Sequence, residues 1–141
     1  MGESSADAVV VRELLDRVWH EGDVGAAERY VADGYVVHHD PGDPWEGRRL
    51  TVAEYVERVE SYRAFLPGLR FTIHDLLAGD GSVMLTWSLH GPRPAGPTAS
   101  SVADSVLAAT GATVYYVVDR KVTGHWQVVH RVEAADEQRS T

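Results

Sequence analysis

Apolar residues recur at helical spacing in the first part of the chain. One such segment runs from Ala6 to His20, and its apolar face holds Val10, Leu14, Leu15 and Val18. A second, short helix is predicted from Asp23, as its cap, to Tyr30. A third helix is predicted after Thr51-Val52-Ala53-Glu54, because this sequence matches a capping box. Between the second and third helices, Gly34 to Asp40 is rich in β-branched and aromatic residues and predicts a strand.

The period changes from helical to alternating after Pro67-Gly68. Alternation of apolar and polar residues predicts two hairpins. Their strands are Leu69 to Ala78 and Ser82 to His90 around Gly79-Asp80-Gly81, then Thr113 to Val118 and Val122 to Val132 around Asp119-Arg120. Ser101 to Ala109 could form a strand or a short helix, and we favour a strand.

Helices followed by antiparallel strands are typical of an α+β fold. We expect one strongly curved sheet, antiparallel or mixed, with the three N-terminal helices against its concave face and a tapering cavity between them. We predict a single domain over residues 1–133 and a disordered polar tail over residues 134–141.

The composition of the chain excludes several classes of partner and site for such a domain. The formal net charge of −8 disfavours nucleic acid and anionic membrane surfaces. The chain contains no cysteine, which excludes disulfides, thiolate catalysis and cysteine metal sites. Neither a signal-peptide pattern nor an apolar run long enough to span a membrane is present, so we expect a cytoplasmic protein.

Short motifs spread along the chain resemble one known family. They are Gly22-Asp23, Tyr35 with His39-Asp40-Pro41, Phe65-Leu66-Pro67-Gly68-Leu69, Asp80 to Gly91 with Trp87, Gly96-Pro97-Thr98, and Tyr115 to Trp126. In order and spacing they resemble the SnoaL-like branch of the nuclear-transport-factor-2-like (NTF2-like) superfamily. The resemblance implies an α+β cone with one internal pocket. Members cyclise polyketide and related intermediates, act as isomerases or hydrolases, or have no known chemistry, so the fold alone does not decide the function.

The sequence departs from the family pattern at two positions. Family members often carry an aspartate four residues after the tryptophan of the last strand, where polyketide cyclases use it as an acid/base group. This chain has His130 there, and Arg120 replaces a turn glycine.

Alternation along the last strand divides its side chains between two faces. One face holds Trp126, Val128, His130 and Val132, and the other holds His125, Gln127, Val129 and Arg131. If Trp126 lines the cavity, His130 does too. A histidine there can take or give a proton near neutral pH. We predict His130 as a catalytic residue, the alternative being a core histidine bonded to a backbone carbonyl.

The resemblance favours His39 as a second catalytic residue, with a hydrogen bond to the loop before Trp45 as the alternative. His38 shares a strand face with Asp40, but without convincing further ligands we predict no metal site. His90 is either a polar pocket group or simply exposed at a strand end. His20 and His74 are expected at the surface without a role.

Aromatic residues provide flat surface for a ligand. Tyr115 and Tyr116 alternate, so one of them faces inward, but alternation does not say which. Asp104 could replace the missing family aspartate, and Gly91 to Pro97 could be either a lid or a plain surface loop. The predicted substrate-binding residues are Trp126, Tyr115, Tyr116, Trp87, His90, Trp45 and Tyr35.

Together these features predict a cofactor-independent cyclase or isomerase of secondary metabolism, such as antibiotic biosynthesis. It would close a ring in a small apolar or polycyclic substrate by acid/base catalysis, through an aldol reaction or epoxide opening. We also expect a homodimer that pairs through the outer face of the sheet. The alternatives are a non-catalytic ligand-binding or dimerisation module of the same fold, or a small epoxide or ester hydrolase.

Overall fold

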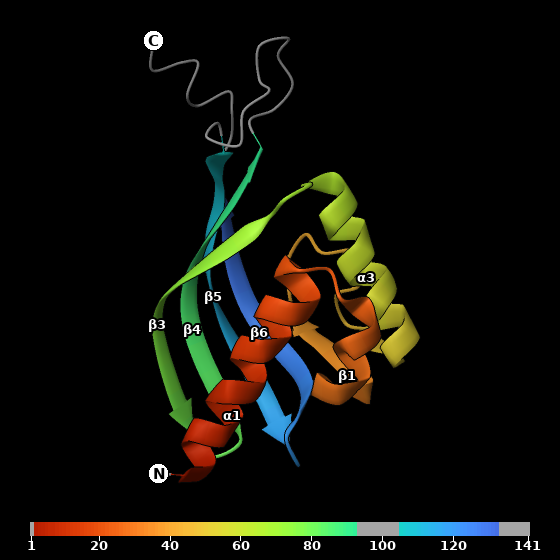
Figure 1. Cartoon of the computed structure of the whole chain (residues 1–141), viewed down its shortest axis with the longest axis vertical. Coiled ribbons are helices and arrows are strands. Elements are labelled where there is room, and N and C mark those ends of the chain that lie inside the picture. Colours follow the sequence, from red (N-terminus) through yellow and green to blue (C-terminus); the bar gives the residue numbers. More distant parts are fainter. Residues whose placement is uncertain (1, 93–104, 133–141) are drawn as a thin grey trace, which may run out of the picture.

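A computed structural model describes residues 2–92 and 105–132 of the chain. Helix α1 (Gly2–Glu13) continues directly into a π-helical segment, η1 (Leu14–His20). Together they form the long N-terminal rod of Figure 1. No helix among the described residues has the length and apolar character needed to cross a membrane. The predicted tail over residues 134–141, Asp104 and most of the Gly91 to Pro97 loop lie outside the described residues.

Two further helical segments flank the first strands. The short η2 (Val24–Ala26) and α2 (Ala27–Tyr30) lead into β1 (Val31–His39), and β2 (Arg49–Leu50) precedes α3 (Val52–Phe65). The predicted capping box is confirmed. Thr51 Oγ1 accepts a hydrogen bond from the Glu54 backbone N–H, while Glu54 Oε1 accepts one from the Thr51 N–H. Asp23 occupies the N-cap position of η2, as predicted, but its side chain makes no capping hydrogen bond.

The remaining strands form two long hairpins. They are β3 (Arg70–Gly79) with β4 (Ser82–Pro92), and β5 (Ser105–Val118) with β6 (Lys121–Arg131). Segment 105–109 belongs to β5, which confirms the strand interpretation there, whereas 101–104 lie outside the described residues. Asp119 and Arg120 both have positive φ, as a tight two-residue hairpin turn requires.

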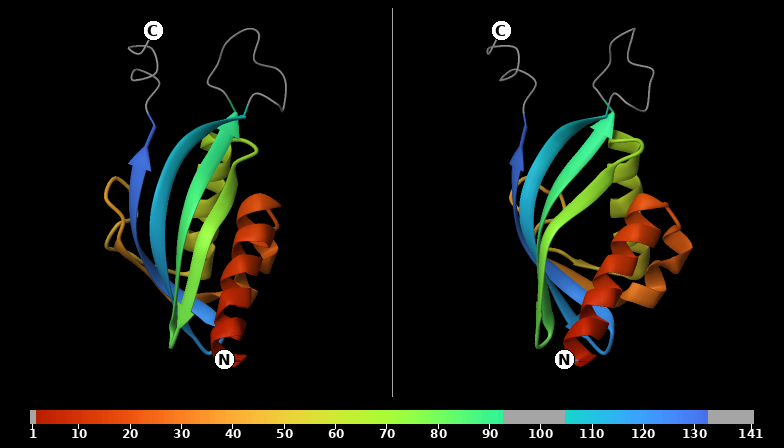
Figure 2. Two further views of the ribbon diagram at one scale, coloured as in Figure 1. Left: turned by 90° about the vertical axis from the view of Figure 1, so that its left-hand side faces the viewer. Right: turned by 60° about the vertical axis from the view of Figure 1, so that its left-hand side comes forward.

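The six described strands form one mixed sheet in the order β2-β1-β6-β5-β4-β3. Neighbouring strands are antiparallel except β1 and β6, which are parallel. Figure 2 shows that the sheet is strongly curved and that the helices lie on its concave side. The predicted α+β cone is therefore confirmed.

The core lies between the concave face and the helices. Its fully buried side chains come from both layers, with Val11, Leu14 and Val18 from the N-terminal rod and Tyr35, Val37 and Val83 from the sheet. Burial of such apolar surface is the main favourable term in folding. The core does not fill the whole space between the layers, and the part left open forms a cavity.

Candidate functional site

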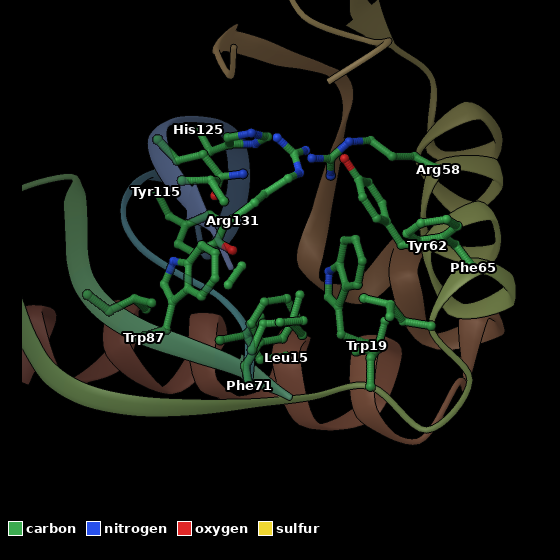
Figure 3. A pocket seen from close by; sticks show the side chains of 18 of the residues that line it. Leu15, Trp19, Arg58, Tyr62, Phe65, Phe71, Trp87, Tyr115, His125 and Arg131 are labelled. Atoms are coloured by element: carbon green, nitrogen blue, oxygen red, sulfur yellow. The ribbon is translucent and has the colours of Figure 1, made fainter. Parts of the chain in front are cut away.

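The cavity occupies about 430 Å³ between the concave face of the sheet, η1 and α3. Figure 3 shows Trp19 and Leu15 from η1 opposite Trp87, Tyr115 and His125 from the sheet. The aromatic residues that line it are Trp19, Tyr35, Tyr55, Tyr62, Phe65, Phe71, Trp87 and Tyr115. A mostly apolar, concave site of this size with a few polar groups is typical of a pocket for a small molecule.

A chain of three buried polar groups reaches the cavity wall. The Tyr35 hydroxyl forms a hydrogen bond with His125 Nδ1, and His125 Nε2 lies 2.8 Å from Asp40 Oδ2. Tyr35 and His125 both line the cavity, while Asp40 lies behind them. A carboxylate can only accept, so the histidine tautomer follows from the network, with Nε2 carrying the proton and Nδ1 accepting from the tyrosine. The arrangement connects the cavity to a buried carboxylate through one imidazole.

Asp40 is held in place by further donors. Its Oδ2 also accepts hydrogen bonds from Gln127 Nε2 at 2.8 Å and from Arg58 Nη2 at 3.2 Å. The amide oxygen of Gln127 accepts from Thr113 Oγ1 at 2.6 Å, and Thr113 in turn accepts from the Trp87 indole N–H at 2.8 Å. Every polar group in this chain therefore has a partner, as burial requires.

Arg58 and Asp43 form a second buried pair beside the first. Asp43 Oδ2 accepts from Arg58 Nη2 at 2.9 Å and from the Tyr62 hydroxyl at 2.6 Å. The backbone N–H of Trp45 donates to Asp43 Oδ1. The Arg58 guanidinium also lies 5.7 Å and 5.3 Å from the ring centroids of Trp19 and Tyr62. The Arg58 guanidinium thus contacts both aspartates and two aromatic rings of the cavity lining.

Burial and charge shift the pKa values in this network. Burial would raise the pKa of Asp43, but Arg58 outweighs it and holds that pKa below its usual value. Burial lowers the pKa of His125, although the hydrogen bond with Asp40 opposes this. Burial also raises the pKa of Tyr35 well above the usual value for tyrosine. The resting site therefore holds a neutral imidazole and a neutral phenol next to ionised Asp43 and Arg58.

The two adjacent tyrosines of β5 take opposite faces. Tyr115 lines the cavity, with its ring centroid 6.2 Å from that of His125. Its hydroxyl makes no hydrogen bond to another described residue, and burial raises its pKa. Tyr116 faces outward and packs edge-on against His38. Tyr115 is therefore the tyrosine that can donate a hydrogen bond to a ligand oxygen.

The structure corrects the prediction that Trp126 and His130 line the cavity. Trp126 is 42% exposed on the outer face of the sheet, and His130 is exposed on the same face. There His130 borders a shallow depression together with His74 and Ser88. The opposite face of β6 carries His125 and Gln127 into the cavity, and Arg131, which is exposed, also belongs to the cavity lining. Alternation separated the two faces correctly, but the direction of the sheet's curvature decided which one is concave.

His39 is also outside the cavity, for a local reason. Val37 pairs with His125 and His39 pairs with Trp126, so His38 is an extra residue in β1 and forms a bulge. The bulge shifts the alternation, so Asp40 points inward and the His39 ring stacks on the Trp126 ring, with centroids 4.5 Å apart. His39 Nδ1 lies 4.0 Å from Glu46 Oε2 of the following loop.

Other predicted residues have mixed positions. Tyr35 and Trp87 line the cavity, whereas Trp45 packs behind Tyr62 and His90 lies at the end of β4; neither is part of the wall. His74 is exposed as expected. His20 is not a plain surface residue, because its Nε2 accepts a hydrogen bond from the Phe71 backbone N–H.

Sequence reasoning missed the residues that build the polar network. These are Asp40, Asp43, Arg58, His125 and Gln127. One signal was available, because Arg58 lies at helical spacing from Tyr55, Val59 and Tyr62, on the apolar face of α3. A charged residue on such a face is rarely buried unless it is paired. Within residues 2–92 and 105–132, no group of three or more acidic and histidine side chains is arranged to hold a metal ion.

Comparisons with known proteins agree with this architecture. A solved candidate polyketide cyclase from Acidithiobacillus ferrooxidans is 38% identical, covers 99% of both chains and superposes with a TM-score of 0.82. Two others are 16% identical and show the fold alone. Wild-type IdmH, a candidate polyketide cyclase from Streptomyces antibioticus, covers 87% of this chain and 91% of its own, with a TM-score of 0.69. A SnoaL-like polyketide cyclase from Agrobacterium tumefaciens covers 94% and 95%, with a TM-score of 0.67.

No curated protein matches the sequence. The model of the SnoaL-like domain, however, matches residues 11–125, which span β1, α3, the first hairpin, β5, the start of β6 and most of the cavity wall. The chain therefore belongs to the SnoaL-like family.

Proposed function

We propose that this chain is a cofactor-independent enzyme of the cyclase or isomerase class, which rearranges a small apolar molecule by proton transfer. The observation that carries the proposal is the Tyr35–His125–Asp40 chain, which brings a proton acceptor to the wall of an apolar cavity. The polyketide cyclase names of the structural relatives are consistent with this class. Catalysis would therefore come from His125 and Tyr35 rather than from His130 and His39.

The chain of groups can take up one proton and give it back. When a substrate C–H or O–H proton passes to the Tyr35 oxygen, the phenol proton passes to His125 Nδ1. The imidazolium so formed donates through Nε2 to Asp40, which stabilises its charge. Because burial raises the pKa of Tyr35, a free tyrosinate is disfavoured, and the transfer has to involve His125 at the same time.

Ring closure also needs a donor for the oxygen that gains charge. The Tyr115 hydroxyl lies on the cavity wall near His125 and can donate to a carbonyl, enolate or epoxide oxygen. In an aldol closure, the proton removed from carbon returns to the new alkoxide, so no net proton is consumed. Epoxide opening by an internal hydroxyl follows the same balance. Both reactions need only the groups named here.

Solvent exchange on a small ketone tests the chemistry without the natural substrate. The probe is 2-tetralone, a bicyclic ketone with an acidic C–H between its carbonyl and its aromatic ring. We expect the protein in heavy water to accelerate loss of that proton signal in the NMR spectrum. Tyr35→Phe and His125→Gln should each reduce the accelerated rate by roughly 10²-fold or more, because each interrupts the proton chain.

The matched controls are His130→Gln and His39→Gln, which change histidines outside the cavity and should leave the exchange rate unchanged. If 2-tetralone binds but exchanges no faster than in buffer, the non-catalytic ligand-binding alternative is correct. If His125→Gln keeps the full rate, the proposed proton chain is wrong.

We also propose that the outer face of the sheet pairs with a second copy of the chain. Register places Met84, Val114 and Trp126 in one row across β4, β5 and β6, with Val128 in the next row. Met84, Trp126 and Val128 are 42–45% exposed, which is an apolar surface at the centre of a sheet rather than at its edge. An exposed apolar face of this kind can pair with the same face of a second copy.

Sedimentation velocity tests the pairing. We expect a dimer for the unmodified chain and a monomer for Trp126→Glu, because a charge buried in the interface is strongly unfavourable. Val9→Glu is the control, since Val9 is a similarly exposed apolar residue on α1. A monomeric unmodified chain would contradict the proposal.

A further inference from the structure

Most polar groups on the cavity wall already have protein partners. Tyr35, His125 and Gln127 are bonded within the Asp40 network, and Tyr62 donates to Asp43. Arg58 is bound to both aspartates. The Tyr55 hydroxyl accepts a hydrogen bond from the Trp19 indole N–H. Two polar side chains of the lining make no side-chain hydrogen bond to another described residue, the Tyr115 hydroxyl and the Arg131 guanidinium. These are the groups available to recognise polar parts of a ligand.

Arg131 is placed where it can meet an anion. It is the last residue of β6, and Figure 3 shows its side chain extending along the cavity wall toward the end where His125 and Arg58 lie. Its Nη1 comes to 3.2 Å from the position that a Cβ on Gly42 would occupy, so the guanidinium lies beside the loop that carries Asp40 and Asp43. None of the described carboxylates lies within ion-pair distance of Arg131, although it is close to this loop.

The local charges do not oppose a bound anion. Both aspartates are buried, and their bonded oxygens are occupied by donors from Arg58, Tyr62, His125 and Gln127. The formal charges of Asp40, Asp43, Arg58 and Arg131 cancel. The N–H donors of the Arg131 guanidinium can therefore bind a carboxylate in a bidentate manner. The chain as a whole is acidic, with a formal net charge of −8.

The rest of the cavity is suited to flat apolar groups. Phe71 packs edge to face against both Trp19 and Trp87, and Phe65, which belongs to the lining, is 79% exposed. We infer that the ligand is a cyclic apolar carboxylic acid, whose carboxylate pairs with Arg131 while its rings lie among these aromatic side chains. This inference rests on the proposed function, because it takes the cavity to be the substrate site.

Two ligands of the same shape but different charge show how much the charge of the ligand contributes to binding. Naphthalene-2-carboxylate and naphthalene-2-carboxamide share their rings and size, but only the first is charged at neutral pH. By isothermal titration calorimetry we expect the carboxylate to bind about tenfold or more tightly than the amide. Arg131→Gln should remove most of this preference by weakening the carboxylate alone, and Arg131→Lys should keep part of it. Raising the salt concentration should likewise weaken only the carboxylate.

Two further variants locate the binding site. Arg12→Gln removes one charge from an exposed position on α1 and should leave both affinities unchanged. Leu89→Trp adds bulk to a residue that lines the cavity and should abolish binding of both ligands. Equal affinities for carboxylate and amide, an unchanged preference in Arg131→Gln, or full binding by Leu89→Trp would each overturn the inference.

The outcome is independent of the catalytic proposal. If 2-tetralone exchange is accelerated but the carboxylate preference is missing, the acid substrate is wrong and the proton chain stands. If the preference depends on Arg131 but no exchange is seen, the cavity binds an acid without the proposed chemistry.

Discussion

The two histidines of β6, His125 and His130, differ because they lie on opposite faces of the same curved sheet. His125 is 2% exposed, and both of its ring nitrogens are hydrogen-bonded. His130 is exposed, beside a shallow depression on the outer face. The residue type is the same, but only His125 is desolvated, oriented and next to a cavity. A histidine becomes a candidate acid/base group through these surroundings and not through its position in a motif.

The contrast extends to the whole sheet. The concave face carries a connected polar row, in which Trp87, Thr113, Gln127 and Asp40 are joined by hydrogen bonds. Next to Gln127 in β6, Val128 points to the convex face, where it is exposed and, as an apolar residue, makes no side-chain hydrogen bond. Polar groups on the concave side are therefore joined in one network, whereas those on the convex side form separate pairs, such as His74 with Ser88.

Arg58→Met should cause the largest loss of stability. Methionine keeps much of the volume but leaves Asp40 and Asp43 buried without their cation, so we expect the free energy of unfolding to fall by about 3–5 kcal/mol. The control is Arg48→Met, which breaks a solvent-exposed ion pair with Glu54 and should change stability by less than about 1 kcal/mol. Urea denaturation measures both.

Adding Asp43→Asn to Arg58→Met should recover part of the lost stability, because one stranded charge is removed. This second variant also distinguishes unpaired charge from lost packing. Equal effects of the two arginine substitutions would show that the concave face tolerates unpaired charge as the surface does.

Thr113→Val and Thr110→Val compare the two faces along one strand. Thr113 is buried and connects the Trp87 indole to Gln127, so valine leaves both partners without their hydrogen bond. We expect a loss of about 1–3 kcal/mol in the free energy of unfolding. Thr110 lies on the convex face next to the depression, and its substitution should change stability by less than about 0.5 kcal/mol. Thermal or urea unfolding checks the pair, and similar losses would contradict the difference between the faces.

The smallest expected effect is a change in the pH dependence of stability. Burial lowers the pKa of His125 below its ordinary value of 6.5, so the unfolded chain binds more protons at this residue than the folded chain does as the pH falls below that value. The stability contributed by neutral His125 is therefore complete above about pH 6.5 and is lost as the pH falls toward its folded pKa, by at most about 1.4 kcal/mol per pH unit.

His125→Gln should reduce the slope of the unfolding free energy against pH between about pH 7 and about pH 5. The slope is reduced and not abolished, because burial also lowers the pKa of His20. Urea denaturation at several pH values measures the slope. An unchanged slope in His125→Gln would mean that this imidazole titrates as it does in the unfolded chain.

Several features could be predicted from the sequence because they depend on near neighbours. Thr51 and Glu54 predicted the start of α3, and alternation predicted both hairpins. The same alternation separated His125 from His130 without saying which one lies inside. The bulge at His38 was not predictable from alternation, and it moved His39 out of the site and Asp40 into it.

By itself, the sequence determined the order of the elements, the α+β class, the family and, apart from the bulged strand β1, the division of the strands into two faces. Each of these depends on periodicity, turn residues or motifs within a few tens of residues. Only the tertiary structure decided which face of β6 is concave, because alternation is symmetrical and curvature belongs to the whole sheet. It also brought Asp40 to Arg58 and to His125, 85 residues away from Asp40. That network exists because buried charges need partners, and the chain supplies them from distant elements.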